Sequence, residues 1–283
     1  MSKQGSVHTI RELEVETLLT LNNHKDYETG DNSDIIATDT QKNTVFILAK
    51  QFGISSPEEF GLILANHFIS KYPWVVQAKI TLSAHPWQRI TDTAGRPHNH
   101  AFVSTPTAVR VASVLLVRGS MPVVSAGIRN LCVLKTTQSA FVNFVSDEFR
   151  SLPDAKDRLF ATIITADWTY NKINKELDFD NAFTTIQDTM LEVFAGPADK
   201  GVFSPSVQNS QHLTQKMVLE RIPQVEKISI SMPNVHYFGF DFSKFPRIPG
   251  LKEQCSGDVY NPVDKASGQI KSTLHRGMIQ SKL

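Results

Sequence analysis

Apolar and polar positions alternate along several stretches of the chain, in the pattern typical of half-buried strands. In the first half this alternation predicts strands over residues 10–22 and 75–83 and another near 100–104, after a turn at 92–95. A short run rich in β-branched and aromatic residues predicts one more strand over 44–50. In the second half the same patterns predict strands over 109–117, 131–135, 159–170, 225–232 and 236–242.

Helical spacing of apolar residues is clearest after Ser56. Ser56 can cap the helix, Pro57 suits its first position, and Glu59 falls where a capping box requires it. The apolar face of this helix would be Phe60, Ile63, Leu64 and Phe68. Three further helices are predicted, over 180–194, from after residue 205 to 221, and from a cap at Thr136 or Thr137 to residue 149.

Strands and helices occur in a similar order in both halves of the chain. This order predicts an α+β fold with helices on one face of antiparallel sheets. We expect two tandem units, one over residues 1–108 and one over 109–283. Small sheets leave open edges, and oligomer formation is one way to close them.

The charges are balanced, since 29 Lys and Arg residues face 28 Asp and Glu residues for a net charge of +1. This balance gives no reason to expect a nucleic-acid partner. Cys132 and Cys255 are too few for a disulfide framework and lack metal-ligand spacing, so a reducing compartment is expected. The polar N-terminus and the lack of a long apolar run predict neither a signal peptide nor a membrane segment.

Thr38 and Asp39 follow a polar, turn-prone loop and precede the strand predicted over 44–50. At the mouth of a strand, a hydroxyl and a backbone N–H can face a ligand while the strand holds them in place. An ordinary capped turn is the alternative interpretation of the same residues. His98 and His100 could be taken for a metal pair on one strand face, but no third ligand follows at a suitable spacing, and no metal is expected.

Longer stretches of the chain resemble the urate oxidase (uricase) family. The resemblance rests on DNSDIIATDTQKNTVFILAK, PEEFGLILANHFISKY, HPWQRI, GRPHNHAF, LKTTQS, DRLFAT, FAGPADKG, SPSVQ, SMPNVHYF and the final Ser281-Lys282-Leu283. It covers nearly the whole chain. It implies tandem tunnelling-fold (T-fold) units that assemble into a barrel-like homotetramer. It also implies oxidation of uric acid by O2 and water to 5-hydroxyisourate and hydrogen peroxide, without a cofactor.

The resemblance assigns substrate-binding roles to residues of the second half. Phe141 matches a stacking phenylalanine, and Arg158 matches an arginine whose planar fork can bind adjacent purine acceptors. Val207 and Gln208 match a backbone N–H donor and a side-chain amide for the opposite rim of the purine. Without the resemblance, Phe141 fits a core position on an amphipathic helix, Arg158 a surface ion pair with its neighbour, and Gln208 a solvated residue near a helix start.

Asn234 and His236 share one face if their segment is a strand, and they match a polar pair where O2 or water binds over the purine. His236 is a candidate proton carrier because imidazole titrates near neutral pH, although a histidine satisfied within a core is the alternative. Thr38 matches a catalytic proton-relay residue that also binds the substrate. Asp39 matches a residue that offers its backbone N–H to the ring. The resemblance implies that these two residues come from the neighbouring subunit.

One departure from the family pattern concerns the lysine that pairs with Thr38. In the family it belongs to a Tyr-Gly-Lys segment ahead of the strand at 10–22, and the sequence begins after that segment. A catalytically impaired, purine-binding isoform is therefore an alternative, and a T-fold enzyme that binds pterins or guanine nucleotides is another. The terminal Ser281-Lys282-Leu283 is a signal read by the peroxisomal import receptor, so a peroxisomal location is expected.

Overall fold

A computed structural model of the chain describes residues 1, 3, 5–105, 107–171, 173, 177–245, 247–248, 258–263 and 265–280. Its first elements are β1 (Glu12–Leu21), α1 (Lys25–Glu28), α2 (Thr38–Phe52), α3 (Pro57–Lys71), β2 (Val75–His85), β3 (Trp87–Thr91), β4 (Pro97–Ser104), β5 (Val109–Val117) and β6 (Val123–Lys135). These are followed by β7 (Phe160–Tyr170), α4 (Phe179–Ala195), α5 (Val207–Arg221), β8 (Val225–Ser231), β9 (Asn234–Val235), β10 (Tyr237–Gly239), η1 (Phe242–Lys244), β11 (Tyr260–Pro262), β12 (Lys271–His275) and α6 (Arg276–Gln280).

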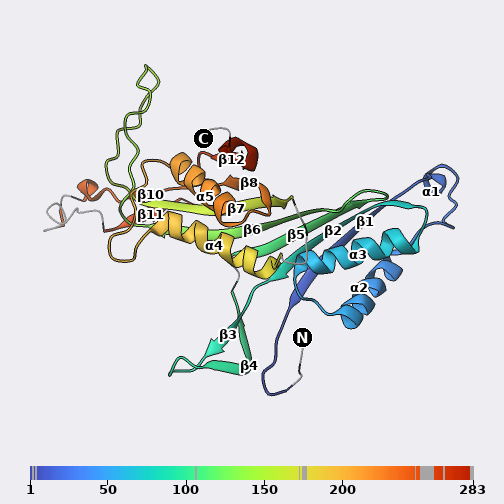
Figure 1. Cartoon of the computed structure of the whole chain (residues 1–283). Coiled ribbons are helices and arrows are strands. Elements are labelled where there is room, and N and C mark those ends of the chain that lie inside the picture. The colour runs from blue at the N-terminus through green and yellow to red at the C-terminus, as the bar shows by residue number, and fades with distance from the viewer. Residues whose placement is uncertain are drawn as a thin grey trace.

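One long antiparallel sheet forms the body of the molecule, in the order β1-β2-β5-β6-β7-β8-β12. The helices α2 and α3 cover one part of the sheet and α4 and α5 the other, all on the same face (Figure 1). The hairpin of β3 and β4 extends away from the sheet, as does the loop between β6 and β7. The α+β class with antiparallel strands, predicted from the sequence, is confirmed.

The two halves repeat each other in register. β1 and β2 pair until a shift places Leu21 opposite Val75, and β7 and β8 pair until a shift places Tyr170 opposite Val225. An arginine after β5 and one after β12 bind backbone carbonyls at and just after the C-terminal ends of α3 and α5 in the same way. The Arg118 guanidinium donates to the carbonyls of Ile69, Tyr72 and Val75, and the Arg276 guanidinium donates to those of Leu219, Ile222 and Val225. The order strand, helix, helix, strand, strand therefore occurs twice.

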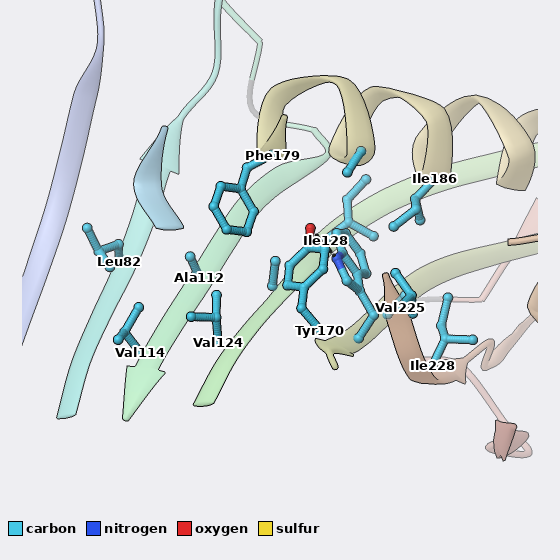
Figure 2. Close-up of a cluster of buried hydrophobic side chains, with 14 of the residues drawn as sticks. Leu82, Ala112, Val114, Val124, Ile128, Tyr170, Phe179, Ile186, Val225 and Ile228 are labelled. Atoms are coloured by element: carbon cyan, nitrogen blue, oxygen red, sulfur yellow. Dashed lines mark hydrogen bonds between the residues drawn. The ribbon is translucent and has the colours of Figure 1, made fainter. Parts of the chain in front are cut away.

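A continuous core lies between the sheet and the helices. Figure 2 shows Leu82 on β2, Val114 on β5, and Val124 and Ile128 on β6, with Ile186 of α4 also facing the core. Tyr170 and Phe179 meet edge to face, with ring centroids 5.1 Å apart. The core crosses from one repeat to the other without a break. The predicted division at residue 108 stays a prediction; β5, just beyond it, pairs with both β2 and β6.

The prediction of a strand over residues 44–50 is wrong, because these residues lie inside α2. Thr44 and Leu48, one helical turn apart, are buried, whereas Phe46 and Ile47 are exposed. Packing of this helical face overrides the β-propensity of a short run, which is a weak preference. Thr38 therefore begins a helix rather than standing at the mouth of a strand.

The helix predicted over 136–149 is also absent, and this segment forms a loop. Gln138 and Asn143 have φ values of 59° and 60°, which a right-handed helix does not accommodate. The strand predicted over 236–242 is reduced to the short β10, followed by η1, and β12 was not predicted. The helix at Ser56 is confirmed, since the Ser56 hydroxyl accepts from the Glu59 N–H; the Glu59 carboxylate, however, binds the Ser55 hydroxyl instead of completing a capping box.

No helix in the described part of the chain is both long and apolar enough to cross a membrane.

Candidate functional site

Arg158 lies two residues before β7, at the neck of the long loop between β6 and β7, where the two ends of this loop come together. Its N–H donates to the carbonyl of Ser139 at 2.9 Å, and its Nε lies 3.4 Å from the Ser139 hydroxyl. Burial lowers the pKa of the Arg158 guanidinium from its ordinary value, which still leaves it a cation at neutral pH. Ser139 itself is fully buried. The fork of Arg158 is thus held half-buried against a fixed backbone.

Phe141 lies beside this arginine on the same loop. The Arg158 guanidinium carbon is 5.5 Å from the centre of the Phe141 ring, within cation–π range. Phe141 stacks on Phe144 with centroids 4.5 Å apart and exchanges backbone hydrogen bonds with Ala155 across the neck. The structure therefore places an aromatic ring beside a planar cationic fork, and Phe141 is on a loop rather than on the helix predicted over 136–149.

The start of α5 is fastened to the same neck. The Ser204 N–H donates to the Gln138 carbonyl, and the Ala140 N–H donates to the Ser204 carbonyl. Val207 is the first residue of α5 and is buried, while the neighbouring Gln208 is exposed. The first N–H groups of a helix have no acceptor within the helix. The Ser206 hydroxyl accepts from the Asn209 N–H, which leaves the N–H groups of Val207 and Gln208 available to an electronegative ligand.

Asn234 and His236 adjoin β7 from its other side. Asn234 belongs to the short strand β9, which follows β8, and it pairs with Thr162 of β7. The His236 ring stacks on Phe238, with centroids 5.8 Å apart, and its Nε2 lies 3.3 Å from the Ser267 carbonyl oxygen. His236 and Phe238 therefore lie on one side of the segment. These contacts place both polar residues near the beginning of β7, where Arg158 lies.

Thr38 and Asp39 lie elsewhere in the chain. They are the first two residues of α2, and Figure 1 places α2 and α5 over different parts of the sheet. The Lys42 ammonium, 2.9 Å away, lowers the pKa of the Asp39 carboxyl, and Asn43 also binds this carboxylate. As the second residue of α2, Asp39 also has a helix-terminal N–H that no acceptor within the helix uses. One copy of the chain does not bring these two residues to Phe141 and Arg158.

A cavity of about 500 Å³ lies at the matching end of the first repeat. Its lining includes Thr9, Pro57 and Ala84, which correspond in register to Arg158, Val207 and Asn234. Thr9 and Arg158, for example, lie equally far before the shifted residues Leu21 and Tyr170. The second repeat therefore places its site residues where the first repeat has a cavity.

An ion network lies beside this cavity. Arg110 binds the fully buried Glu58 and also Asp180, each at 2.6 Å, and Arg11 binds Asp180 at 2.7 Å. Burial raises the pKa of the Glu58 carboxyl, although Arg110 opposes this shift. Burial has the same tendency at Asp180, but the hydrogen bonds from Arg11 and Arg110 outweigh it and lower the pKa of that carboxyl. The start of α4, which contains Asp180, is thereby docked against the first repeat.

Sequence reasoning missed the polar residues that support the site, namely Ser139, Ser204 and Lys135. A signal for Lys135 is present in the pattern. In β6 it shares the parity of Leu131 and Val133, so the alternation of the strand directs it inward. A lysine at an inward position of a strand end needs acceptors, which is the cue to look for a polar support there.

The targeting residues Ser281, Lys282 and Leu283 lie outside the described residues. Among the described residues, no group of three or more His, Cys, Asp or Glu side chains is arranged to hold a metal ion.

Comparison with known proteins agrees with this fold and shows the family. The family model described as Uricase matches residues 1–115 and 124–271. The chain is 45% identical over 309 residues to uricase from Drosophila melanogaster, covering 100% of this chain and 86% of that protein. It is 46% identical over 274 residues to uricase from Danio rerio, covering 97% and 89% of the two chains. The crystal structure of uricase from Arthrobacter globiformis is similar with a TM-score of 0.86 at 31% identity, covering 97% of this chain and 88% of that one. The chain therefore belongs to the uricase family and is, as a member, a urate oxidase.

Proposed function

We propose that this urate oxidase acts at a site shared between two copies of the chain, one supplying Phe141 and Arg158 and the other Thr38 and Asp39. The observation that carries the proposal is the position of the Arg158 fork beside the Phe141 ring, next to the open N-terminus of α5. Urate is a flat anion with carbonyl and N–H groups around its rim. A plate, a cationic fork and free backbone N–H groups complement such a ligand.

Each residue of the second repeat has a distinct role in this proposal. Arg158 binds two adjacent acceptors of the purine, while the Val207 N–H and the Gln208 amide hold the opposite rim. Phe141 stacks on the ring and fixes its plane. Asn234 and His236 lie over the plane and hold O2 or the attacking water, and His236 can carry a proton. The residues thus keep the urate anion rigid while it transfers electrons to O2, giving 5-hydroxyisourate and hydrogen peroxide.

The internal repeat supports the contribution of the second copy. Within the chain, the first turn of α4 docks through Asp180 onto Arg11 and Arg110, beside the cavity of the first repeat. By order of elements α2 corresponds to α4, and Asp39 corresponds to Asp180 as the second residue of its helix. A second copy docked in the same manner brings Thr38 and Asp39 to Arg158. In the described part of the chain, the sheet ends in the unpaired edges of β1 and β12, and closing them is a reason to propose a homotetramer.

The direct test follows urate, O2 and hydrogen peroxide together with purified protein. We expect the ultraviolet absorbance of urate to fall, with one O2 consumed and one peroxide formed for each urate, and without an added cofactor. Binding of urate by calorimetry without any O2 uptake would contradict the proposal and indicate a purine-binding protein instead.

We also propose that the protein is imported into peroxisomes by a receptor that reads its last three residues. Deleting Ser281–Lys282–Leu283 is expected to leave folding and urate turnover unchanged, because such a signal is read by its receptor and is not part of a folded core. The measurement is fluorescence co-localisation of the N-terminally tagged full chain and the deletion variant with a peroxisomal marker. Retention of the deletion variant in peroxisomes would show that another signal directs the protein there.

A further inference from the structure

Lys135, the last residue of β6, directs its ammonium group into the protein behind the candidate site. Its Nζ donates to the carbonyls of Phe194 and Val202, at 3.2 and 2.8 Å, and to the hydroxyl of Ser204, at 2.8 Å. The rings of Phe160 and Phe194 lie 5.8 and 5.4 Å from it. All three N–H bonds of the ammonium are therefore used. In the part of the chain that the structure describes, Lys135 forms no ion pair with a carboxylate.

Ser204, which Lys135 binds, connects two parts of the site, the loop that carries Phe141 and the start of α5, and we call it the junction. Its backbone exchanges hydrogen bonds with Gln138 and Ala140, in the neck of the loop that carries Phe141. Its hydroxyl also accepts from the Ser210 hydroxyl in the first turn of α5, at 3.0 Å. Ser204 is 2% exposed, so these bonds do not compete with bulk water. The separation between the Phe141 loop and the start of α5 is consequently set at Ser204.

Arg158 is linked to the same junction through Ser139. The Arg158 N–H donates to the Ser139 carbonyl, and Ser139 and Ser204 form a parallel bridge. Lys135 is therefore connected, through Ser204 and its neighbours, to Arg158, to the loop that carries Phe141, and to the N-terminus of α5. A misplacement of about 1 Å in such a constellation can cost on the order of 10²-fold in rate.

We infer that Lys135 is a positioning residue for urate oxidation, which acts through Ser204 to hold the Phe141–Arg158 side of the site at the correct distance from Val207 and Gln208. This inference rests on the site proposed above. Lys135 does not touch the substrate in this scheme. The ammonium carries three donors on one nitrogen, which matches the two carbonyls and the one hydroxyl that surround it.

The test compares Lys135→Met with Arg276→Met. Arg276 is a matched control, because it also donates to three acceptors, in its case three backbone carbonyls, but at the opposite end of α5 from the site. Both substitutions leave acceptors without a donor and are expected to lower the melting temperature. Only Lys135→Met is expected to weaken urate binding, about tenfold or more, measured by calorimetry without O2, and to lower kcat in addition.

Two further variants give results even if Lys135→Met folds poorly. Ser204→Ala removes the hydroxyl that accepts from Lys135 and Ser210, and like Lys135→Met it is expected to raise the Kd for urate. If Lys135→Met folds, the double variant Lys135→Met/Ser204→Ala gives a third measurement. Its Kd for urate is expected to rise by much less than the product of the two single fold-changes, because both substitutions remove the same contact. Lys135→Arg is expected to restore stability more than it restores binding.

The outcomes separate this inference from the site assignment. If Arg158→Lys weakens urate binding while Lys135→Met and Ser204→Ala bind urate as tightly as Arg276→Met does, the site assignment holds and the positioning role is wrong. If Arg158→Lys also leaves the Kd for urate unchanged, the proposed site itself is wrong. Multiplicative effects of the two single substitutions would likewise contradict action through Ser204.

Discussion

Two inactive variants, Thr38→Val and Arg158→Met, are expected to regain activity when they assemble together. Thr38→Val removes the hydroxyl proposed for proton transfer, whose positioned contribution is typically about 10²–10⁴-fold. Arg158→Met removes the fork. If each site takes Thr38 from one copy and Arg158 from another, a mixed pair has one intact site and one doubly altered site. Random mixing then restores roughly one site in four, far above either variant alone.

The measurement is urate turnover after the two variants are unfolded, mixed and refolded together, compared with each variant refolded alone. A third variant, Thr38→Val combined with Arg158→Met, serves as the control, because mixing it with Thr38→Val leaves every site altered in at least one residue. Activity that stays at the level of the separate variants would show that the two residues do not complement each other between copies. The separation of α2 from α5 within one chain is the reason to expect that they do.

The strands and helices that lie in one stretch of regular pattern could be predicted from the sequence. The alternation over 10–22 predicted β1, and the Ser56 cap with Pro57 predicted the start of α3. α4 and α5 also begin and end within a residue or two of their predicted limits. In these elements the local preference and the burial of one face favour the same structure.

The errors occur where the deciding contact is distant in sequence. Residues 44–50 have β-branched and aromatic side chains, yet packing of Thr44 and Leu48 against the core makes them helical. Positive φ values at Gln138 and Asn143 cannot be recognised from the local pattern, which fits an amphipathic helix equally well. Lys271–His275 is a strand because it pairs with β8, a partner that its own short sequence does not reveal.

For the site, pattern alone predicted only isolated candidates, and family resemblance selected among them. The structure adds the geometry, with Phe141 beside Arg158 and both joined to the start of α5 through Ser139 and Ser204. The parity of Lys135 in its strand is a sequence signal for such a support, but Ser139 and Ser204 look like any polar residue until their contacts are known.

Replacing Arg158 with lysine is expected to raise the KM and the Kd for urate by about ten- to hundredfold, while the melting temperature changes little. Lysine keeps the positive charge but offers a point donor in place of a planar fork, so one of two parallel hydrogen bonds to the purine is lost. A hydrogen bond to a charged group is worth roughly 1.5–3 kcal/mol, which corresponds to this range. The backbone bond from Arg158 to Ser139 is retained, so the neck of the loop should stay in place.

Arg221→Lys is the matched control for this substitution. Arg221 is also a two-nitrogen donor, binding Glu192 through both Nη atoms, but it ends α5 at the opposite end from Val207. It is partly exposed, so losing its fork is expected to change stability by about 1 kcal/mol or less and to leave urate binding unchanged. Both variants exchange a guanidinium for an ammonium, so a difference between them reflects the position of the arginine and not the type of substitution. Equal Kd values for urate in Arg158→Lys and Arg221→Lys would mean that Arg158 does not bind the purine, whereas a difference confined to Arg158 identifies the end of the sheet at which urate is held.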